Sequence, residues 1–370
     1  MKRITTASIL IILTLAAFFW YLLNISQDNS DQNPQDSNKQ QIDSIVSVIA
    51  VGDIMLGSSY PTEEYLPKDG GIKLLQNIKS YLFNKNSKIP GLVFGNLEGV
   101  LTDIEGIRKE CDDESKCYNF KMPSKSVSIL KDAGFNLLSI ANNHVGDFGT
   151  EAIEDEIKTL GNNSIYFAGA KQQPYTSFTI ANIRIGFTAF SPNSETNDLR
   201  DIKKACELIK FLDSTNDIVI VSFHGGAEGA INNHVVKETE YFLDENRGNV
   251  YQFAHRAIDA GADLVLGHGP HVLRAIEIYH KRLIAYSLGN FATYRQINIS
   301  GTSGIACILN LKLNQKGELL ICKIIPTIQK QPGTPIYDNQ NKALKIIRDL
   351  TNADFPEGSI ILKDDGKIDF

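Results

Sequence analysis

The sequence predicts an α/β protein in which largely parallel strands alternate with helices. Short runs rich in β-branched residues, typical of strands buried on both faces, recur along its first half. Segments with the apolar spacing of helices separate them. The expected strands lie at 44–51, 91–94 and 136–141, and the expected helices at 72–83, 127–133 and 150–160. Strands that alternate with helices in this way pair mainly in parallel.

The second half of the chain adds strands more often than helices. The expected strands lie at 165–167, 177–180, 183–190, 218–223, 263–266, 275–278, 282–286, 305–313 and 318–325, and the expected helices at 201–212 and 250–260. The strands at 177–180 and 183–190 are joined by two residues only, which predicts a tight hairpin. So many late strands favour a second sheet packed against the first.

Composition fits a globular protein, because 42% of the 370 residues are hydrophobic and 22% are charged. The net charge of −6 argues against nucleic acid as a partner, since that binding needs a basic surface. The five cysteines form no C-x-x-C pair and predict no thiolate zinc site. Cys111 and Cys117 either close a small disulfide loop or stay unpaired, whereas Cys307 and Cys322 are expected to be small core residues.

The N-terminus predicts a membrane anchor. Residues 7–25 carry no charge over about the 20 residues that a helix needs to cross a bilayer. Lys2 and Arg3 precede this run and should stay in the cytoplasm, which places the rest of the chain outside it. An aromatic cluster at 18–21 replaces the small-residue site of a cleaved signal peptide. The pattern therefore favours an uncleaved, single-pass anchor in the bacterial cell membrane over a cleaved signal peptide.

Four segments are expected along the chain. Residues 1–25 form the transmembrane anchor, and residues 26–41, nearly all Asn, Gln, Asp and Ser, form a solvated linker. Residues 42–330 form the folded domain. The hydrophobic pattern weakens after it, so residues 331–370 are expected to be a peripheral extension with one short helix at 342–350.

Polar side chains gather at five strand ends, where α/β sheets bind ligands. They are Asp53; Asn96 and Glu98; Asn142, Asn143 and His144; His224; and His268 and His271. Carboxylate, amide and imidazole donors without a thiolate suit Mn²⁺, Fe²⁺, Zn²⁺ or Mg²⁺. Such a set can hold two metal ions, which in hydrolases clamp the attacking and leaving oxygen atoms. His234, His255 and His280 end no strand and are expected to play structural roles.

Six motifs resemble one family. They are GDIMLG at Gly52, GNLEG at Gly95, ANNH at Ala141 with Asp147 and Gly149 after it, HGG at His224, GHGPHV at Gly267 and YSLGNF at Tyr286. Together they resemble the CapA family of capsule and poly-γ-glutamate synthesis proteins, within the calcineurin-like metallophosphatase superfamily. The resemblance covers about residues 42–293. It implies a four-layer α/β/β/α sandwich of two packed sheets and a site for one or two divalent metal ions.

The resemblance also implies a role for each residue type. Asp53 resembles the first metal-binding aspartate of the superfamily, but Met55 stands where the usual D-x-H pattern of the superfamily has an imidazole. Asn96 or Glu98 would replace the bridging carboxylate. The remaining expected metal ligands are Asn143, His224, His268 and His271. His144 and Asn142 are the expected catalytic residues, and Glu228, Asp147 and Asn290 are expected to bind substrate.

Two functions remain open at this point. The first is a membrane-anchored, extracytoplasmic metal-dependent hydrolase that acts on an envelope polymer or its phosphorylated carrier. The second is a non-catalytic accessory protein that binds polymer or a synthase. In both, the expected partners are a capsule or polyglutamate synthase membrane complex and an anionic envelope polymer.

Overall fold

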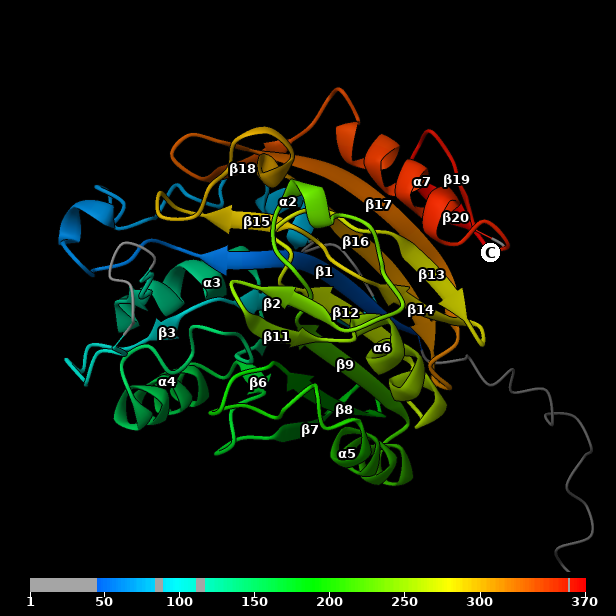
Figure 1. Ribbon diagram of the computed structural model, residues 1–370, viewed down its shortest axis with the longest axis horizontal. Coiled ribbons are helices and arrows are strands. Elements are labelled where there is room, and N and C mark those ends of the chain that lie inside the picture. Colours follow the sequence, from blue (N-terminus) through cyan, green and yellow to red (C-terminus); the bar gives the residue numbers. More distant parts are fainter. Residues whose placement is uncertain (1–44, 84–88, 111–116, 359) are drawn as a thin grey trace, which may run out of the picture. The chain divides into compact units, whose positions relative to one another are not determined.

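Two β-sheets packed face to face organise the chain (Figure 1). The structure is a computed structural model that describes residues 45–83, 89–110, 117–358 and 360–370. The expected anchor, the expected linker and Cys111 lie outside these ranges, so the structure does not test the anchor or the Cys111–Cys117 disulfide. Across the described ranges, no helix is both long and apolar enough to cross a membrane.

The large sheet has ten strands. Eight follow the order β19-β20-β17-β16-β1-β2-β5-β6, while β15 pairs with β1 and β18 pairs with β17. In chain order the bounds are β1 Ile45–Met55, β2 Gly91–Leu97, β5 Leu137–Ser139, β6 Tyr166–Ala168, β15 Asn290–Thr293, β16 Ile305–Asn314, β17 Leu319–Lys330, β18 Thr334–Tyr337, β19 Ile361–Leu362 and β20 Lys367–Asp369. The pairs β1–β2, β2–β5 and β5–β6 are parallel, as predicted.

The small sheet has six strands in the order β13-β14-β12-β9-β8-β7. Their bounds are β7 Tyr175–Ile180, β8 Ile183–Phe190, β9 Ile218–His224, β12 Leu264–His268, β13 Ile276–Tyr279 and β14 Arg282–Ala285. The predicted hairpin joins β7 to β8 through Ala181 and Asn182, whose φ angles are 51° and 65°. Two left-handed residues in succession form the turn that matches the twist of antiparallel strands.

Three hydrophobic cores define the layers. The first lies between the sheets and joins β1, β2 and β16 to β8, β9 and β12. The second joins the outer face of the large sheet to α3 and α4, and the third joins the small sheet to α5 and α6. The helices are α2 Lys79–Leu82, α3 Val127–Ala133, α4 Thr150–Asn162, α5 Ile202–Thr215, α6 Val250–Asp259 and α7 Lys342–Asp354. The predicted α/β fold with two packed sheets is confirmed.

Residues 72–83, predicted as one helix, differ from the prediction. Only α2 at the end of this segment is helical, and the residues before it form successive turns with bonds such as Leu74 N–H to Gly71 O and Ile78 N–H to Leu75 O. Of the apolar residues with the expected spacing, Leu75, Ile78 and Leu82 are buried, but Ile72 is 68% exposed. The apolar pattern therefore predicted most of the buried face, because turns with i to i+3 bonds can satisfy nearly the same pattern.

The C-terminal residues 331–370, expected to be peripheral, belong to the main fold. Strands β18, β19 and β20 extend the large sheet. Helix α7 packs against β16 and β17, and its residues Ala343, Leu344 and Ile347 are part of the core between the sheets (Figure 1). These strands gave only a weak sequence pattern because each is two to four residues long.

Two short ribbons follow strands of the two sheets. Strand β3 (Val100–Leu101) comes after β2 and pairs in parallel with β4 (Lys121–Met122). Strand β10 (Glu240–Phe242) comes after β9 and pairs with β11 (Glu245–Gly248) in antiparallel fashion. The second ribbon carries Glu240, Glu245 and Arg247, which contribute to the site described next, and Phe120, directly before β4, also lies at that site.

Candidate metal centre

The predicted side chains converge where β1 and β2 of the large sheet and β9 and β12 of the small sheet end. Asp53 and Asn96 are register partners on the two parallel strands of the large sheet. His224 and His268 are register partners on the parallel strands of the small sheet. Register therefore places one pair on each sheet at the same level, and the pairs meet across the space between the sheets.

Hydrogen bonds tie the two pairs together. Asn96 Nδ2 donates to Asp53 Oδ1 at 2.9 Å and lies 3.2 Å from His224 Nδ1. His268 Nδ1 lies 3.1 Å from the same Asp53 oxygen. All four side chains are completely buried. Residues from both sheets thus form one buried polar cluster inside an otherwise apolar sandwich.

His271 joins this cluster from the loop after β12. Its Nδ1 lies 3.2 Å from Asp53 Oδ2 and 3.0 Å from Asn290 Oδ1, and its Nε2 lies 3.4 Å from Glu98 Oε1. The backbone of His271 is left-handed, with φ of 58°. This turn returns the imidazole toward Asp53 although the motif GHGPHV is one residue longer than the superfamily pattern.

Several buried atoms of the cluster have no hydrogen-bond partner. They are Asn96 Oδ1, both carboxylate oxygens of Glu98, His224 Nε2 and His268 Nε2. Buried polar atoms normally have a partner, because an unsatisfied one costs about 1–3 kcal/mol. Ligand atoms of Glu98, His224 and His271 also lie within 4.8 Å of one another. The donor set and these unpaired atoms fit a divalent metal ion.

The pKa shifts in the cluster have opposing directions. Burial raises the pKa of Glu98 to about 7, and burial lowers the pKa of His224 well below its ordinary value. Burial also disfavours the charged form of Asp53, but hydrogen bonds from His268 and His271 hold its pKa below the usual range. The pKa of His271 rises to about 10 against the effect of burial, because Glu98 and Asp53 surround it. Without metal, His271 thus supplies the positive charge that balances Asp53.

His144 lies beside the cluster and is held by Asp147. Its Nδ1 is 2.9 Å from Asp147 Oδ2, which also accepts a hydrogen bond from the backbone N–H of Phe120 at 2.9 Å. Burial alone would lower the pKa of His144, but the Asp147 carboxylate raises it overall. A hollow of about 310 Å³, here named the catalytic hollow, is lined by His144, Glu98, Glu228 and His271 among others.

Three predicted roles need correction. Asn142, expected to be catalytic, uses its side chain to bind backbone groups, accepting from His144 N–H at 2.9 Å and donating to Leu97 O at 2.8 Å. Asp147 and Asn290, expected to touch substrate, are completely buried. Asp147 positions His144, and Asn290 positions His271 by bonding both its ring and its carbonyl oxygen.

The roles of the other predicted residues stay predictions. Glu228 lines the catalytic hollow, so its assignment to substrate stays a prediction. Asn143 Oδ1 is buried without a hydrogen-bond partner, but no described contact joins it to the metal cluster, and its role also stays a prediction. Met55 is buried and its sulfur receives the N–H of Gly57 at 3.3 Å, so the missing imidazole is not replaced there.

Sequence reasoning missed two buried arginines near the site. Arg274 forms a two-pronged ion pair with Glu240, at 2.9 and 2.6 Å, and also binds the carbonyl oxygens of Ala227 and Asn232. It thereby fixes the loop that carries Glu228. Arg247 Nη2 lies 3.0 Å from Glu228 Oε1. The only signal in the sequence was the position of Arg274, three residues after His271 in a motif already assigned to the site.

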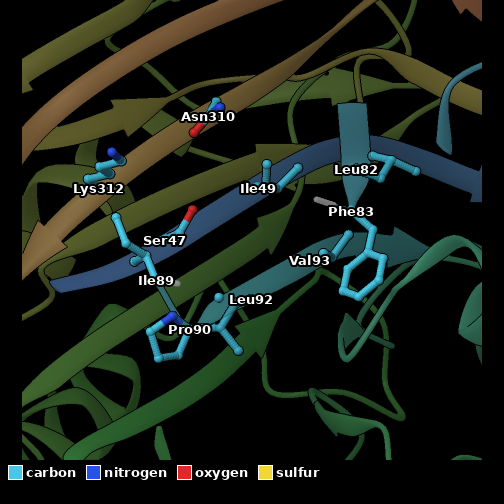
Figure 2. A pocket seen from close by; sticks show the side chains of 11 residues that line it. Ser47, Ile49, Leu82, Phe83, Ile89, Pro90, Leu92, Val93, Asn310 and Lys312 are labelled. Atoms are coloured by element: carbon cyan, nitrogen blue, oxygen red, sulfur yellow. The ribbon is translucent and has the colours of Figure 1, made fainter. Parts of the chain in front are cut away.

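A separate hollow of about 460 Å³ lies at the opposite ends of β1 and β2 (Figure 2). Figure 2 shows Ser47 and Ile49 of β1 and Val93 of β2, with Leu82 and Phe83 to the right of them in this view. Six residues separate Ser47 from Asp53, or about 20 Å along a strand. Among the described residues that line it, Lys312 is the only charged one, and none is a carboxylate or an imidazole.

The fold and the cluster together define an α/β protein with imidazole, carboxylate and amide ligands where two sheets meet, the class that the motifs predicted. The chain belongs to the family described as "Bacterial capsule synthesis protein PGA_cap", which matches residues 47–295. Most of the residues of the cluster, from Asp53 to Asn290, lie inside the matched range. The predicted resemblance to CapA proteins is confirmed.

Two named relatives span most of the chain. The "PGA biosynthesis protein CapA" of Bacillus subtilis is 28% identical over 351 residues, covering 90% of this chain and 84% of the relative. The "Capsule biosynthesis protein CapA" of Bacillus anthracis is 26% identical over 350 residues, covering 88% and 77%. Among solved structures, the calcineurin-like phosphoesterase YfkN from Bacillus subtilis is 13% identical, with a TM-score of 0.43 and coverage of 85% of this chain and 99% of that one.

Proposed function

We propose that this protein is a metal-dependent hydrolase, anchored in the cell membrane with its folded domain outside the cytoplasm, that acts in the synthesis or export of a capsule or poly-γ-glutamate type polymer. The observation that carries the catalytic part is the set of unpaired buried donors around Glu98, His224 and His271, next to a hollow that holds His144. The names of the two CapA relatives support the polymer.

The ligand set for a first ion would be Asp53, His268, His271, His224 and either Asn96 or Glu98. A divalent ion bound there would supply positive charge that lowers the pKa of a water molecule and stabilises charge on the reacting oxygen atoms. One or two ions of Mn, Zn, Fe or Mg suit these ligands. Thiolates are absent from the cluster, so softer ions are disfavoured.

His144 would act as the proton donor to the leaving group. Its Nδ1 is engaged by Asp147, which leaves Nε2 for the substrate. The Asp147 carboxylate raises the pKa of His144 above its ordinary value against the effect of burial, which favours the imidazolium that a general acid requires. Phe120 packs against the His144 ring, with centroids 4.3 Å apart, and holds its plane. Asp147 and Phe120 thus orient one proton toward the hollow.

The metal part of the proposal is tested by elemental analysis of the purified chain after incubation with Mn²⁺ or Zn²⁺. We expect at least one ion per chain, and we expect His224→Ala and Asp53→Ala to lose it. Lys203→Gln, on the exposed face of α5, serves as the matched control and should bind as the parent does. The ligand assignment would be contradicted if the parent protein holds less than one ion per chain and His224→Ala does not change that content.

The catalytic part is tested at His144. Replacing it with Ala should leave the metal content unchanged and lower turnover by about 10²–10⁴-fold, the effect of losing a general acid. The substrates are a generic phosphodiester and poly-γ-glutamate, assayed beside complementation of polymer display in cells. If neither substrate is cleaved and the His144→Ala protein still complements fully, the hydrolase proposal fails.

A non-catalytic accessory role is the second candidate. Met55, where the superfamily pattern has an imidazole, favours it because one expected metal ligand is missing. In this case the domain would bind the polymer or a synthase complex at the same edge of the sheets. Full complementation by His144→Ala with loss of complementation by Asp53→Ala would support a site that binds without catalysing.

A further inference from the structure

A second hollow, here named the outer subsite, lies next to the catalytic hollow. It encloses about 320 Å³ and is lined by Lys109, Asn143, Asn193, Arg200 and Glu245 among others. Consecutive residues line the two hollows, since Asn143 lines the outer subsite and His144 lines the catalytic hollow. A ligand bound at His144 would therefore lie close to the outer subsite.

The two hollows differ in charge. The catalytic hollow is lined by the carboxylates of Glu98 and Glu228 and by no lysine or arginine of the described chain. The outer subsite is lined by Lys109 and Arg200, and the one carboxylate among its described lining residues, Glu245, is 3.5 Å from the guanidinium of Arg247. The catalytic hollow sets two imidazoles, His144 and His271, against its two carboxylates, whereas lysine and arginine side chains predominate in the outer subsite, which therefore favours an anionic group.

The cations of the outer subsite retain capacity for a ligand. Arg200 uses Nε and Nη2 to bind Asp198, at 2.8 and 2.9 Å, and so keeps its Nη1 protons. No described residue lies within hydrogen-bond or ion-pair distance of Lys109 Nζ, although the backbone N–H of Lys109 binds Asp147 O at 2.8 Å. This backbone bond fixes the Lys109 stem close to the residue that orients His144.

Arg247 connects the walls of the two hollows. Its side chain is 2% exposed, and it pairs with Glu228 on the catalytic side and with Glu245 on the outer side. Its Nε and Nη2 atoms form no hydrogen bond with good geometry. A buried guanidinium with unused donors adds positive charge between the hollows and favours an anion near this wall.

We propose that the outer subsite binds an anionic oxygen group, a carboxylate or a phosphate, of the same substrate whose reacting bond lies in the catalytic hollow. Lys109 and Arg200 supply the charge, and the side-chain amide of Asn246 supplies a neutral donor. The inference rests on the proposed function for the identity of the reacting bond, but not for binding itself. A polymer that carries a charge on every unit would place one unit in each hollow.

The test is calorimetric titration of the full-length, Mn²⁺-loaded chain that carries His144→Ala, so that turnover does not interfere. The two probes, titrated separately, are γ-linked pentaglutamate and inorganic phosphate. We expect Lys109→Gln to raise the Kd of at least one probe by about three- to tenfold and Lys109→Glu to raise it further, since each removes or reverses a charge at the rim. Lys203→Gln, on exposed α5, is the control and should leave Kd unchanged.

The outcomes are distinct. An effect on pentaglutamate alone identifies a carboxylate, and an effect on phosphate alone identifies a phosphate. If neither probe binds, or if Lys109→Gln and Lys109→Glu behave as the control does, the outer subsite is overturned. If Lys109→Gln raises the Kd of a probe although the parent protein hydrolyses neither substrate, the outer subsite stands and the hydrolase proposal fails.

Discussion

At the scale of single residues, the site depends on side chains that hold other side chains. Asp147 is completely buried and bonds His144, while Asn290 is completely buried and bonds His271. Asp147 follows His144 by three residues in the same motif, whereas Asn290 lies in a different motif from His271 and reaches it through the fold. We therefore assign their effect to the pKa and the direction of two imidazoles.

Asp147→Asn tests this positioning role. The carboxylate raises the pKa of His144, so its removal should lower that pKa and move the alkaline limit of turnover to lower pH. NMR titration of the His144 ring would measure the same shift without any substrate. A His144 pKa that is the same in the parent and in Asp147→Asn would remove the positioning role.

Glu156 on α4 allows a prediction about stability. It is buried, its Oε1 accepts the N–H of Leu101 at 3.1 Å, and burial raises its pKa to about 8 from an ordinary value of 4.5. Between these two pH values the folded chain keeps a proton that the unfolded chain has released, so the free energy of unfolding falls as pH rises. Glu156→Gln removes this titration. We expect its free energy of unfolding, relative to the parent, to increase by about 2–4 kcal/mol from pH 4.5 to pH 9.

Urea denaturation of both proteins across this pH range gives the measurement. Glu154→Gln, two positions earlier on the exposed face of α4, is the control and should show no such relative change. Parallel pH curves for the parent and Glu156→Gln would mean that Glu156 is already ionised in the folded protein.

At the scale of elements, sequence patterns predicted the strands well where burial is continuous. Strand β8 matches its predicted range, and β9 extends one residue further, to His224. The residues of the polar cluster were predictable because most of them end such a strand or follow it directly. The partners of Asn142, Asp147 and Asn290 were not predictable, since Asp147 bonds a backbone N–H 27 residues away and register alone brings Asn290 beside Asp53. Residue type shows that a side chain is polar, but only long-range pairing shows what it contacts.

Helix α7 provides a test of the corrected C-terminal region. Ile347 is buried in the core between the sheets, so Ile347→Ala should lower the free energy of unfolding by about 2–4 kcal/mol. Lys345→Ala, on the exposed side of the same helix, should change it by less than about 0.5 kcal/mol. Equal changes in the free energy of unfolding of the two variants, measured by chemical denaturation, would mean that α7 is peripheral and not part of the core.

At the scale of the whole molecule, the proposed membrane anchor remains to be tested. Residues 7–25 are uncharged and lack a small-residue cleavage site, so we expect the protein to stay in the membrane fraction with its N-terminal segment intact. N-terminal sequencing of the mature protein measures this directly. A mature chain that starts between residues 26 and 42 would mean that the domain is released from the membrane.

The polar cluster has a consequence for how the two sheets hold together. Asp53 and Asn96 belong to the large sheet, and His224 and His268 belong to the small sheet, so every ion bound among them would be a cross-link between the sheets at one edge. Metal binding would then hold the two sheets together and resist their sliding or separation. In an envelope poor in transition metals, the same chains would be mechanically weaker and more easily digested, so metal supply would set how long each molecule survives.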